Sequence, residues 1–186
     1  MNADLSEPAS SSRNSREEAE GELRALLARW QRPLFGFAWR YLHNAADAEE
    51  VTIETFARYC EHRGRLRAGA QVSSWLFATA ANLCRNRHRW RRRHPQEPDE
   101  PSGDLPCPDP SPDDAARLGE LRAEVRAAID ALPPDQKTAL LLHEYEQASC
   151  REIAAVVGCS ERGVETRLYR AKRQLRRRLR HLLPEV

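Results

Sequence analysis

Aromatic residues are scarce in this chain of 186 residues, making up 6% of the sequence against 31% for charged residues. Few large apolar side chains and many charges favour two small domains over one large core. No run approaches the roughly 20 consecutive apolar residues of a membrane-spanning helix. Residues 1–16 lack the apolar stretch of a secretory signal. We therefore expect a cytoplasmic protein with no membrane insertion and a disordered leader over residues 1–16.

Paired cysteines are also lacking. The five cysteines are an odd number and include no Cys-x-x-Cys pair, which argues against a disulfide framework. Cys84 and His88 lie four residues apart and could share a metal with His94 and Cys107. Four ligands spread over a helix, an arginine run and a proline-rich loop are a weak zinc signal. We expect no metal and no cofactor, and thiols that are buried or incidental.

Strand-like alternation is absent, and apolar residues recur at helical spacing, so the predicted fold class is all-α. Residues 95–114 carry seven prolines and seven acids but no Lys or Arg. Such a segment is predicted to be an extended, flexible acidic linker. It divides the chain into two small helical domains, over residues 17–94 and 116–183, with the linker at 95–115.

The N-terminal domain is predicted to contain three helices. Pro33 should kink or restart the first helix. The second should begin near Asn44 and Asp47. Gly64 and Gly69 bracket a basic loop, and a third helix follows it into a run of arginines. The apolar stripe expected on the second helix is Ile53, Phe56, Ala57 and Cys60.

The C-terminal domain carries the sequence signature of a helix-turn-helix. A helix is predicted over residues 135–146, after two prolines. Ser149 and Glu152 form a capping box, Gly158 supplies a tight turn, and Ser160 caps a long basic helix. A short helix, a glycine turn and a capped second helix are typical of this DNA-binding motif.

Basic residues gather in two places. Residues 85–93 hold six arginines, and residues 162–180 hold nine Lys or Arg against one acid. Basic clusters of this kind indicate a polyanionic partner. On the long helix, Arg162 and Thr166 could contact base edges, whereas the remaining cations suit phosphates. A three-helix bundle with a charged face, and a basic helix end resting in solvent, remain the alternatives.

Acidic residues at 47, 49, 50 and 54 form one helical cluster. Paired carboxylates can serve acid–base chemistry or a metal. Here no histidine completes a Glu-x-x-His pair and no second acidic helix faces the cluster. A protein-binding surface is therefore preferred, with a solvated face as the alternative.

Three blocks in order carry a resemblance to a known family. They are DAEEVTIETFARY (47–59), SSWLFATAANLCRNRHRWRRR (73–93) and ALPPDQKTALLLHEYEQASCREIAAVVGCSERGVETRLYRAKRQLRRRL (131–179). The chain resembles bacterial RNA polymerase sigma factors of the extracytoplasmic-function group of the sigma-70 family, which keep only regions two and four. The resemblance implies a protein that is not an enzyme and has no catalytic residue. Such a protein binds core RNA polymerase, directs it to promoters and assists promoter melting.

The resemblance also implies roles for individual residues. Those of the polymerase-binding helix are Asp47, Glu50, Glu54 and Phe56. The loop 64–74 matches a segment that captures a flipped promoter base. Those near the opened minus-ten strand are Asn82, Arg85, Asn86 and Arg89. Those at the minus-thirty-five element are Arg162, Glu165, Thr166, Arg167, Tyr169, Arg170 and Arg173.

The chain departs from the family pattern in several places. The replacements are Ile53 for glutamine, Ala78 for arginine, Asn86 for aspartate, Cys150 for tyrosine, Gly163 for threonine and Glu165 for lysine. The last two weaken the recognition helix and one phosphate contact. A classical helix-turn-helix regulator would leave the N-terminal blocks unexplained. An enzyme or metal sensor built on Cys84, His88 and the carboxylates is the rival from another class, and an anti-sigma partner stays an open question.

Overall fold

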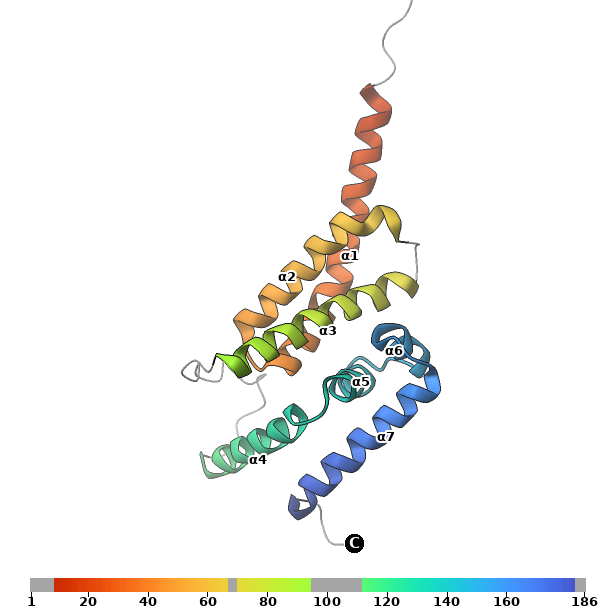
Figure 1. Cartoon of the computed structure of the whole chain (residues 1–186). Helices are drawn as coiled ribbons and strands as arrows, with labels where there is room; N and C mark the ends of the chain where they lie inside the picture. The colour runs from red at the N-terminus through yellow and green to blue at the C-terminus, as the bar shows by residue number, and fades with distance from the viewer. Residues whose placement is uncertain (1–8, 67–69, 95–111, 183–186) are drawn as a thin grey trace, which may run out of the picture. The chain divides into compact units, whose positions relative to one another are not determined.

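The computed structural model describes residues 9–66, 70–94 and 112–182, and over these ranges it contains helices and no strand, which confirms the all-α class. The helices are α1 (Ala9–Leu42), α2 (Ala45–His62), the 3-10 turn η1 (Arg63–Arg65), α3 (Ala70–Arg93), α4 (Pro112–Asp130), α5 (Pro134–Tyr145), α6 (Cys150–Val157), α7 (Glu161–Arg178) and the 3-10 turn η2 (Arg180–Leu182). Figure 1 shows their arrangement.

α1 runs through Pro33 as one helix, so of the two predicted outcomes this proline does not restart the helix. The lost hydrogen bond is offset because the apolar residues that follow Pro33, beginning with Leu34, Phe37 and Ala38, are buried. α1 also begins at Ala9, within the predicted leader. The reason is that Arg, Glu and Ala, frequent in residues 13–29, are strong helix formers. Residues 1–8 lie outside the described ranges.

The chain divides into two compact units, one ending at Pro33 and the other beginning at Leu34. Within the second unit we call residues 34–93 the N-terminal bundle and residues 112–182 the C-terminal bundle. In the N-terminal bundle the last turns of α1 pack with α2 and α3; for example, Phe37 and Phe77 meet edge to face at 5.7 Å. Its fully buried side chains include Leu34, Phe37, Tyr41, Thr55, Leu76 and Cys84.

The buried face of α2 is not the stripe that the sequence suggested. Ile53 is 69% exposed and Cys60 is exposed, whereas Thr52 and Thr55 are buried. Each threonine hydroxyl donates to the carbonyl four residues earlier, at 2.7 Å in both cases. Because their hydroxyls are satisfied inside the helix, the threonines can be buried, and the helix turns Ile53 outward.

The C-terminal bundle starts earlier than predicted. α4 begins at Pro112, within the segment assigned to the linker. Proline is favoured in the first helical turn, which suits this start. The rest of the predicted linker, residues 95–111, lies outside the described ranges. In the core, Leu132, Leu140 and Ala171 cluster with the half-buried Ile129 and Leu175, joining α4, α5 and α7.

Candidate functional site

The helix-turn-helix is built by the capping contacts that the sequence predicted. Ser149 Oγ accepts from the Glu152 N–H at 3.3 Å, and the Glu152 carboxylate accepts from the Ser149 N–H at 2.9 Å. Gly158 ends α6 at φ 67°, in the left-handed region. Ser160 Oγ then caps α7 by accepting from the Gly163 N–H at 3.2 Å. The turn between α6 and α7 is therefore fixed by local bonds.

The outward face of α7 is a continuous polar stripe. Its members repeat at i, i+3, i+4, i+7, i+8 and i+11 and are all exposed: Arg162, Glu165, Thr166, Tyr169, Arg170 and Arg173. On the opposite side Val164, Leu168 and Ala171 are buried. Tyr169 is 64% exposed, although a tyrosine commonly buries its ring. These six side chains, which we call the α7 stripe, thus point away from the bundle together.

One predicted DNA-contact residue lies off this stripe. Arg167 is half-buried, and its Nη1 donates to the Gly163 carbonyl at 3.2 Å. Its Nη2 lies 3.9 Å from Asp135 Oδ2 at the start of α5. Thr166 is on the stripe, but its hydroxyl donates to the Arg162 carbonyl at 2.9 Å. A base would therefore meet the methyl group of Thr166 or a hydroxyl that changes its partner.

The basic face of α3 carries the predicted strand-contact residues. Asn82, Asn86 and Arg89 are exposed on one side of the helix. Arg85 lies on the same side but is half-buried, because its Nη2 donates to Asp135 Oδ1 at 2.9 Å. The structure therefore groups all four residues on one face of α3, and one of them is already paired with an acid.

Asp47 is buried, whereas a docking residue for another protein would be exposed. It is 7% exposed and its N–H is bound by the N-cap Asn44 at 2.8 Å. Its carboxylate lies 3.2 Å from Arg87 Nη1 and 2.8 Å from Arg91 Nε. Asp47 thus fixes two arginines of α3 against the start of α2. The sequence reasoning missed this link, although the four-residue spacing of the two arginines was a usable signal.

The other residues of the acidic helix divide by exposure. Glu50 pairs with Arg87, yet its side chain remains 64% exposed. Glu54 pairs with Arg58 at 2.7 Å and is 50% exposed. Phe56 is 8% exposed and belongs to the core. The accessible part of this face is formed by the two glutamates with Ile53 between them.

A buried lysine was not singled out by the sequence. Lys137 on α5 is 1% exposed; its Nζ donates to the Tyr41 carbonyl and to Asp130 Oδ1, at 2.6 Å each. Burial lowers the pKa of Lys137, and Asp130 opposes that shift. Burial acts to raise the pKa of Asp130, but bonds from His43 and Lys137 hold it below its ordinary value. Burial raises the pKa of the Tyr41 phenol to about 12. The charged lysine and aspartate therefore stabilise each other here.

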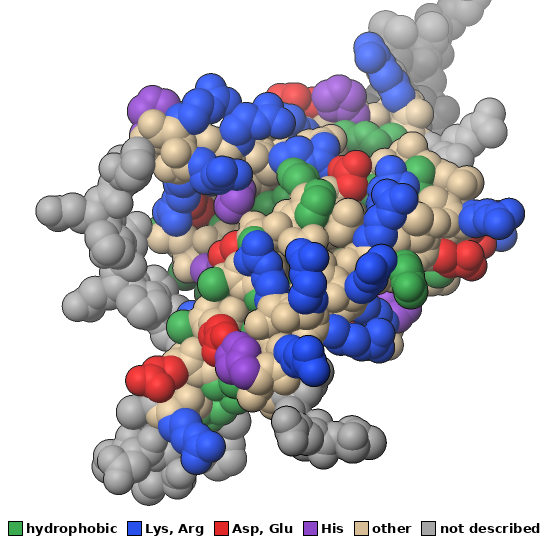
Figure 2. All heavy atoms as spheres, turned by 60° about the horizontal axis from the view of Figure 1, so that its bottom comes forward, with side chains coloured by type: hydrophobic (Ala, Val, Ile, Leu, Met, Phe, Trp, Pro, Cys, Tyr) green, Lys and Arg blue, Asp and Glu red, His purple; other side chains and the backbone are tan. Residues whose placement is uncertain are grey.

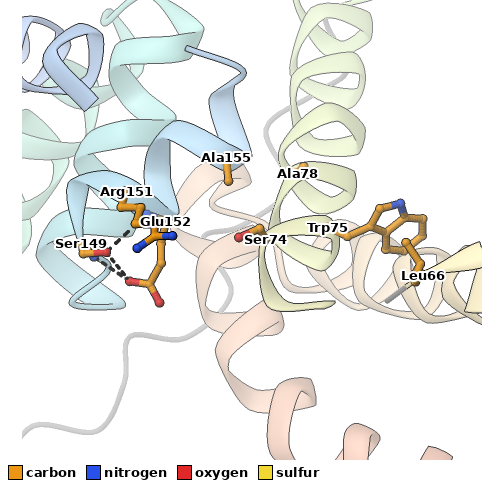
Figure 3. A pocket seen from close by; sticks show the side chains of 8 residues that line it. All are labelled: Leu66, Ser74, Trp75, Ala78, Ser149, Arg151, Glu152 and Ala155. Atoms are coloured by element: carbon orange, nitrogen blue, oxygen red, sulfur yellow. Dashed lines mark hydrogen bonds between the residues drawn. The ribbon is translucent and has the colours of Figure 1, made fainter. Parts of the chain in front are cut away.

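A pocket of about 790 Å³ adjoins the loop that was matched to base capture. Leu66, Ser74, Trp75 and Ala78 line one side, and α6 supplies the other, as Figure 3 shows. α3 begins at Ala70 and runs without a break through Ser73 and Ser74. Residues 67–69 of the loop lie outside the described ranges.

Figure 2 looks at the side of the molecule that is lowest in Figure 1, and Lys and Arg side chains outnumber the acids there.

In the described part of the chain, no group of three or more His, Cys, Asp and Glu side chains could hold a metal ion. Burial raises the pKa of the Cys84 thiol to about 12, which keeps it protonated. Of the helices described, none is long and apolar enough to cross a membrane.

Comparison with known proteins agrees with this geometry. A family model for sigma-70 region 2 matches residues 26–94, and one for sigma-70 region 4 matches residues 122–175. The RNA polymerase sigma-H factor of Pseudomonas aeruginosa is 32% identical over 169 residues, which cover 87% of this chain and 88% of that protein.

Two solved structures share the fold. The sigma factor RpoE, in a co-crystal with the anti-sigma factor NepR from Bartonella quintana, superposes with a TM-score of 0.63 at 21% identity, covering 86% of this chain and 97% of that one. CnrH, in complex with the cytosolic domain of CnrY, gives 0.65 at 24% identity, with 87% and 90% covered.

Proposed function

The chain belongs to the sigma-70 family of RNA polymerase sigma factors, and we propose that it performs the family's promoter-directed initiation through three separate helix faces. The α7 stripe reads duplex DNA, one face of α3 holds the opened strand, and the exposed side of α2 binds core polymerase. The family consists of initiation factors, so no catalytic residue is assigned. We place the protein in the cytoplasm, where polymerase works.

The α7 stripe is the observation that carries the proposal. Six exposed side chains on one side of a helix that follows a left-handed glycine turn fit a helix lying in the major groove. Arg162 is near the start of α7, where a recognition helix meets base edges, and arginine bonds guanine in a bidentate manner. Arg170 and Arg173 fit phosphates farther along.

We propose that α3 acts on the strand that promoter opening exposes. Asn82 and Asn86 can bond base edges, while Arg85 and Arg89 follow the phosphate backbone. All four lie on one side of α3. The apolar wall of Trp75 and Leu66 near the loop 64–74 offers a planar ring for a base that leaves the stack.

Polymerase binding is proposed for the exposed part of α2. Ile53 forms an apolar centre between the carboxylates of Glu50 and Glu54. At 69% exposure, Ile53 is the most exposed large apolar side chain described. Asp47 and Phe56 support that surface from inside. The related RpoE structure holds an anti-sigma factor, and a protein of that kind is a candidate partner of this chain too.

The test is transcription from genomic fragments with core polymerase and the full chain. Mapped starts should share two sequence elements, and Arg162→Ala should lower activity and relax base preference at one upstream position by about 1–3 kcal/mol. Arg117→Ala is the matched control, because Arg117 is exposed on α4 and off the stripe. Starts unchanged from those of core polymerase alone would reject the function.

A further inference from the structure

A glycine lies inside α7, at a position where it weakens the helix. Gly163 is the third residue of α7, in the turn that Ser160 caps. Glycine is one of the poorest helix formers, because it loses more backbone freedom on folding than any other residue. The proposed function gives Gly163 no role. Its surroundings supply a physical reason for a residue without a side chain.

Two neighbouring side chains lie where a side chain on Gly163 would begin. A Cβ atom at this position would be 3.1 Å from Arg167 Nη1 and 3.2 Å from Cys159 Sγ. Both distances are shorter than the roughly 3.5–4.0 Å at which such atoms pack. Gly119 on α4 differs, because nothing lies within 4 Å of a Cβ atom there. Gly163 therefore permits a close approach that Gly119 does not.

The guanidinium of Arg167 uses this space and has a partner at each end. Its Nη1 donates to the Gly163 carbonyl at 3.2 Å. Its Nη2 lies 3.9 Å from Oδ2 of Asp135, in the first turn of α5. A planar guanidinium with partners on two sides is fixed in direction. We call the Gly163 backbone, with the space above it, and the Asp135 carboxylate the Arg167 seat.

The seat directs a cation of α7 toward α5 instead of the face proposed to meet DNA. Arg167 follows Thr166 of the α7 stripe and precedes Arg170 by one turn, yet its side chain is only 29% exposed. Farther along α7, Lys172 Nζ lies 2.8 Å from Glu144 Oε1, also on α5. Acids of α5 thus engage two cations of α7. A cation that is already paired contributes less to the release of counterions from DNA.

We propose that Gly163 is a positioning residue for DNA binding: it opens the seat that holds Arg167 against α5 and off the phosphate backbone. The inference rests on the proposed function, in which α7 enters the major groove. A side chain at position 163 would push the guanidinium out of the seat. Because Arg167 borders the α7 stripe, its long side chain would then reach a phosphate. The glycine thereby sets how many phosphates α7 engages.

The first test measures binding of the full chain to a labelled duplex of mixed sequence by fluorescence anisotropy over a range of salt concentrations. Gly163→Thr should bind about three- to tenfold more tightly at low salt and steepen the log–log salt dependence by about 0.9, the value of one added phosphate contact. Gly163→Ala should shift both in the same direction by less, because a single methyl group displaces Arg167 less than a branched side chain does.

Arg167→Gln separates the seat from other effects of a new side chain. Alone, it should leave the salt dependence of the parent unchanged, because the seated guanidinium does not contact DNA. Combined with Gly163→Thr, it should cancel the gain in affinity and the steeper slope. Damage to the fold would weaken binding and would not steepen the slope, so the sign of the change excludes a merely structural effect.

The second test measures the crowding at position 163 without DNA, by urea unfolding. Gly119→Ala is the matched control, because it places the same methyl group in open space on an exposed helix position. It should raise the urea midpoint through helix propensity. Gly163→Ala should raise the midpoint less or lower it, since Arg167 and Cys159 must move. With Arg167→Gln already present, Gly163→Ala should become more favourable.

Three results would overturn the inference: a Gly163→Thr variant that binds as the parent does, a gain that survives Arg167→Gln, or equal midpoint gains at positions 163 and 119. Absence of duplex binding by the parent and by every variant would instead reject the role proposed for α7. The urea comparison would still show in that case whether the seat exists, so the two failures are distinguishable.

Discussion

The two basic helices, α3 and α7, differ in how their arginines are held. On α3, Arg85, Arg87 and Arg91 each lie within 3.2 Å of a carboxylate of another helix. On the α7 stripe, Arg162, Arg170 and Arg173 are exposed, and none of the acids that the structure describes forms an ion pair with them. The protein therefore uses much of the charge of α3 to orient that helix, and leaves the charge of the α7 stripe exposed.

The difference fits the roles proposed for the two helices. A helix that must present two asparagines to an irregular single strand needs a fixed orientation, which acids on its other side provide. A helix that enters the regular groove of a duplex can use mobile arginines, because phosphates recur along it at even spacing. Protein stability and DNA affinity should therefore respond in opposite ways to charge removal on the two helices.

The largest expected effect is on stability at Asp47. Asp47→Ala leaves Arg87 and Arg91 without their shared carboxylate, and should lower the unfolding free energy by about 2 kcal/mol, less than a fully buried pair would cost. The reduction reflects the exposure that the two arginine side chains keep, 33% and 36%. Urea unfolding measures the effect. Glu49→Ala, an exposed neighbour, should change stability by no more than ~0.5 kcal/mol; equal losses in both variants would contradict the clamp.

The next effect is on duplex binding at the α7 stripe. Arg170→Gln and Arg173→Gln should each weaken binding of the full chain to duplex DNA and flatten the log–log salt dependence by about 0.9. Arg87→Gln should leave that slope unchanged, because its charge is already engaged by Asp47 and Glu50. Fluorescence anisotropy over a range of salt concentrations supplies both numbers. An equal decrease of the salt-dependence slope in Arg87→Gln would contradict the proposed difference between α3 and α7.

A charge reversal on the stripe should have an effect of similar size in the opposite direction. Glu165 is an exposed acid among these cations, and Glu165→Lys should strengthen binding to all duplexes alike and steepen the salt slope by roughly one. The competing expectation is that Glu165 accepts a bond from a cytosine amino group. In that case the variant would bind the preferred site less well and discriminate less by about 1–3 kcal/mol.

The smallest effect is a pH dependence near the contact between the bundles. Burial, with Lys137 next, lowers the pKa of His88 below its ordinary 6.5. The folded state disfavours protonation of His88. The unfolding free energy should therefore be highest above pH 6.5 and should fall as the pH drops below 6.5. Unfolding at a series of pH values should show this decline in the parent and a weaker one in His88→Gln. An identical decline in both would assign it to other groups.

Features set by neighbours in the sequence could be predicted. The helix caps at Asn44, Ser149 and Ser160 depend on hydrogen bonds between residues three positions apart, and the structure contains all three caps. The helix-turn-helix and the outward stripe of α7 follow from the same local rules. The spacing of residues alone predicts these elements, because each capping hydrogen bond joins residues within one helical turn.

Features set by distant residues could not be predicted. Nothing in the spacing of Tyr41 and Lys137, 96 positions apart, indicates that they meet. Asp47 was assigned to docking because its charge suggested exposure, whereas two arginines of another helix allow its burial. The predicted stripe of α2 omits Thr52 and Thr55, because a threonine hydroxyl can be buried only when it bonds its own helix, as both do here.

The α7 stripe also limits how much sequence one helix can specify. Its twelve residues from Arg162 to Arg173 are separated by eleven steps, which make about 16 Å at 1.5 Å per step, or about five base pairs at 3.4 Å each. Even if the stripe distinguished all four alternatives at each of these base pairs, it would select one five-base-pair sequence in roughly a thousand. A genome offers about a million or more competing positions. The α7 stripe alone therefore cannot specify a single genomic site, and the remaining sequence information would have to come from the opened strand that α3 is proposed to bind.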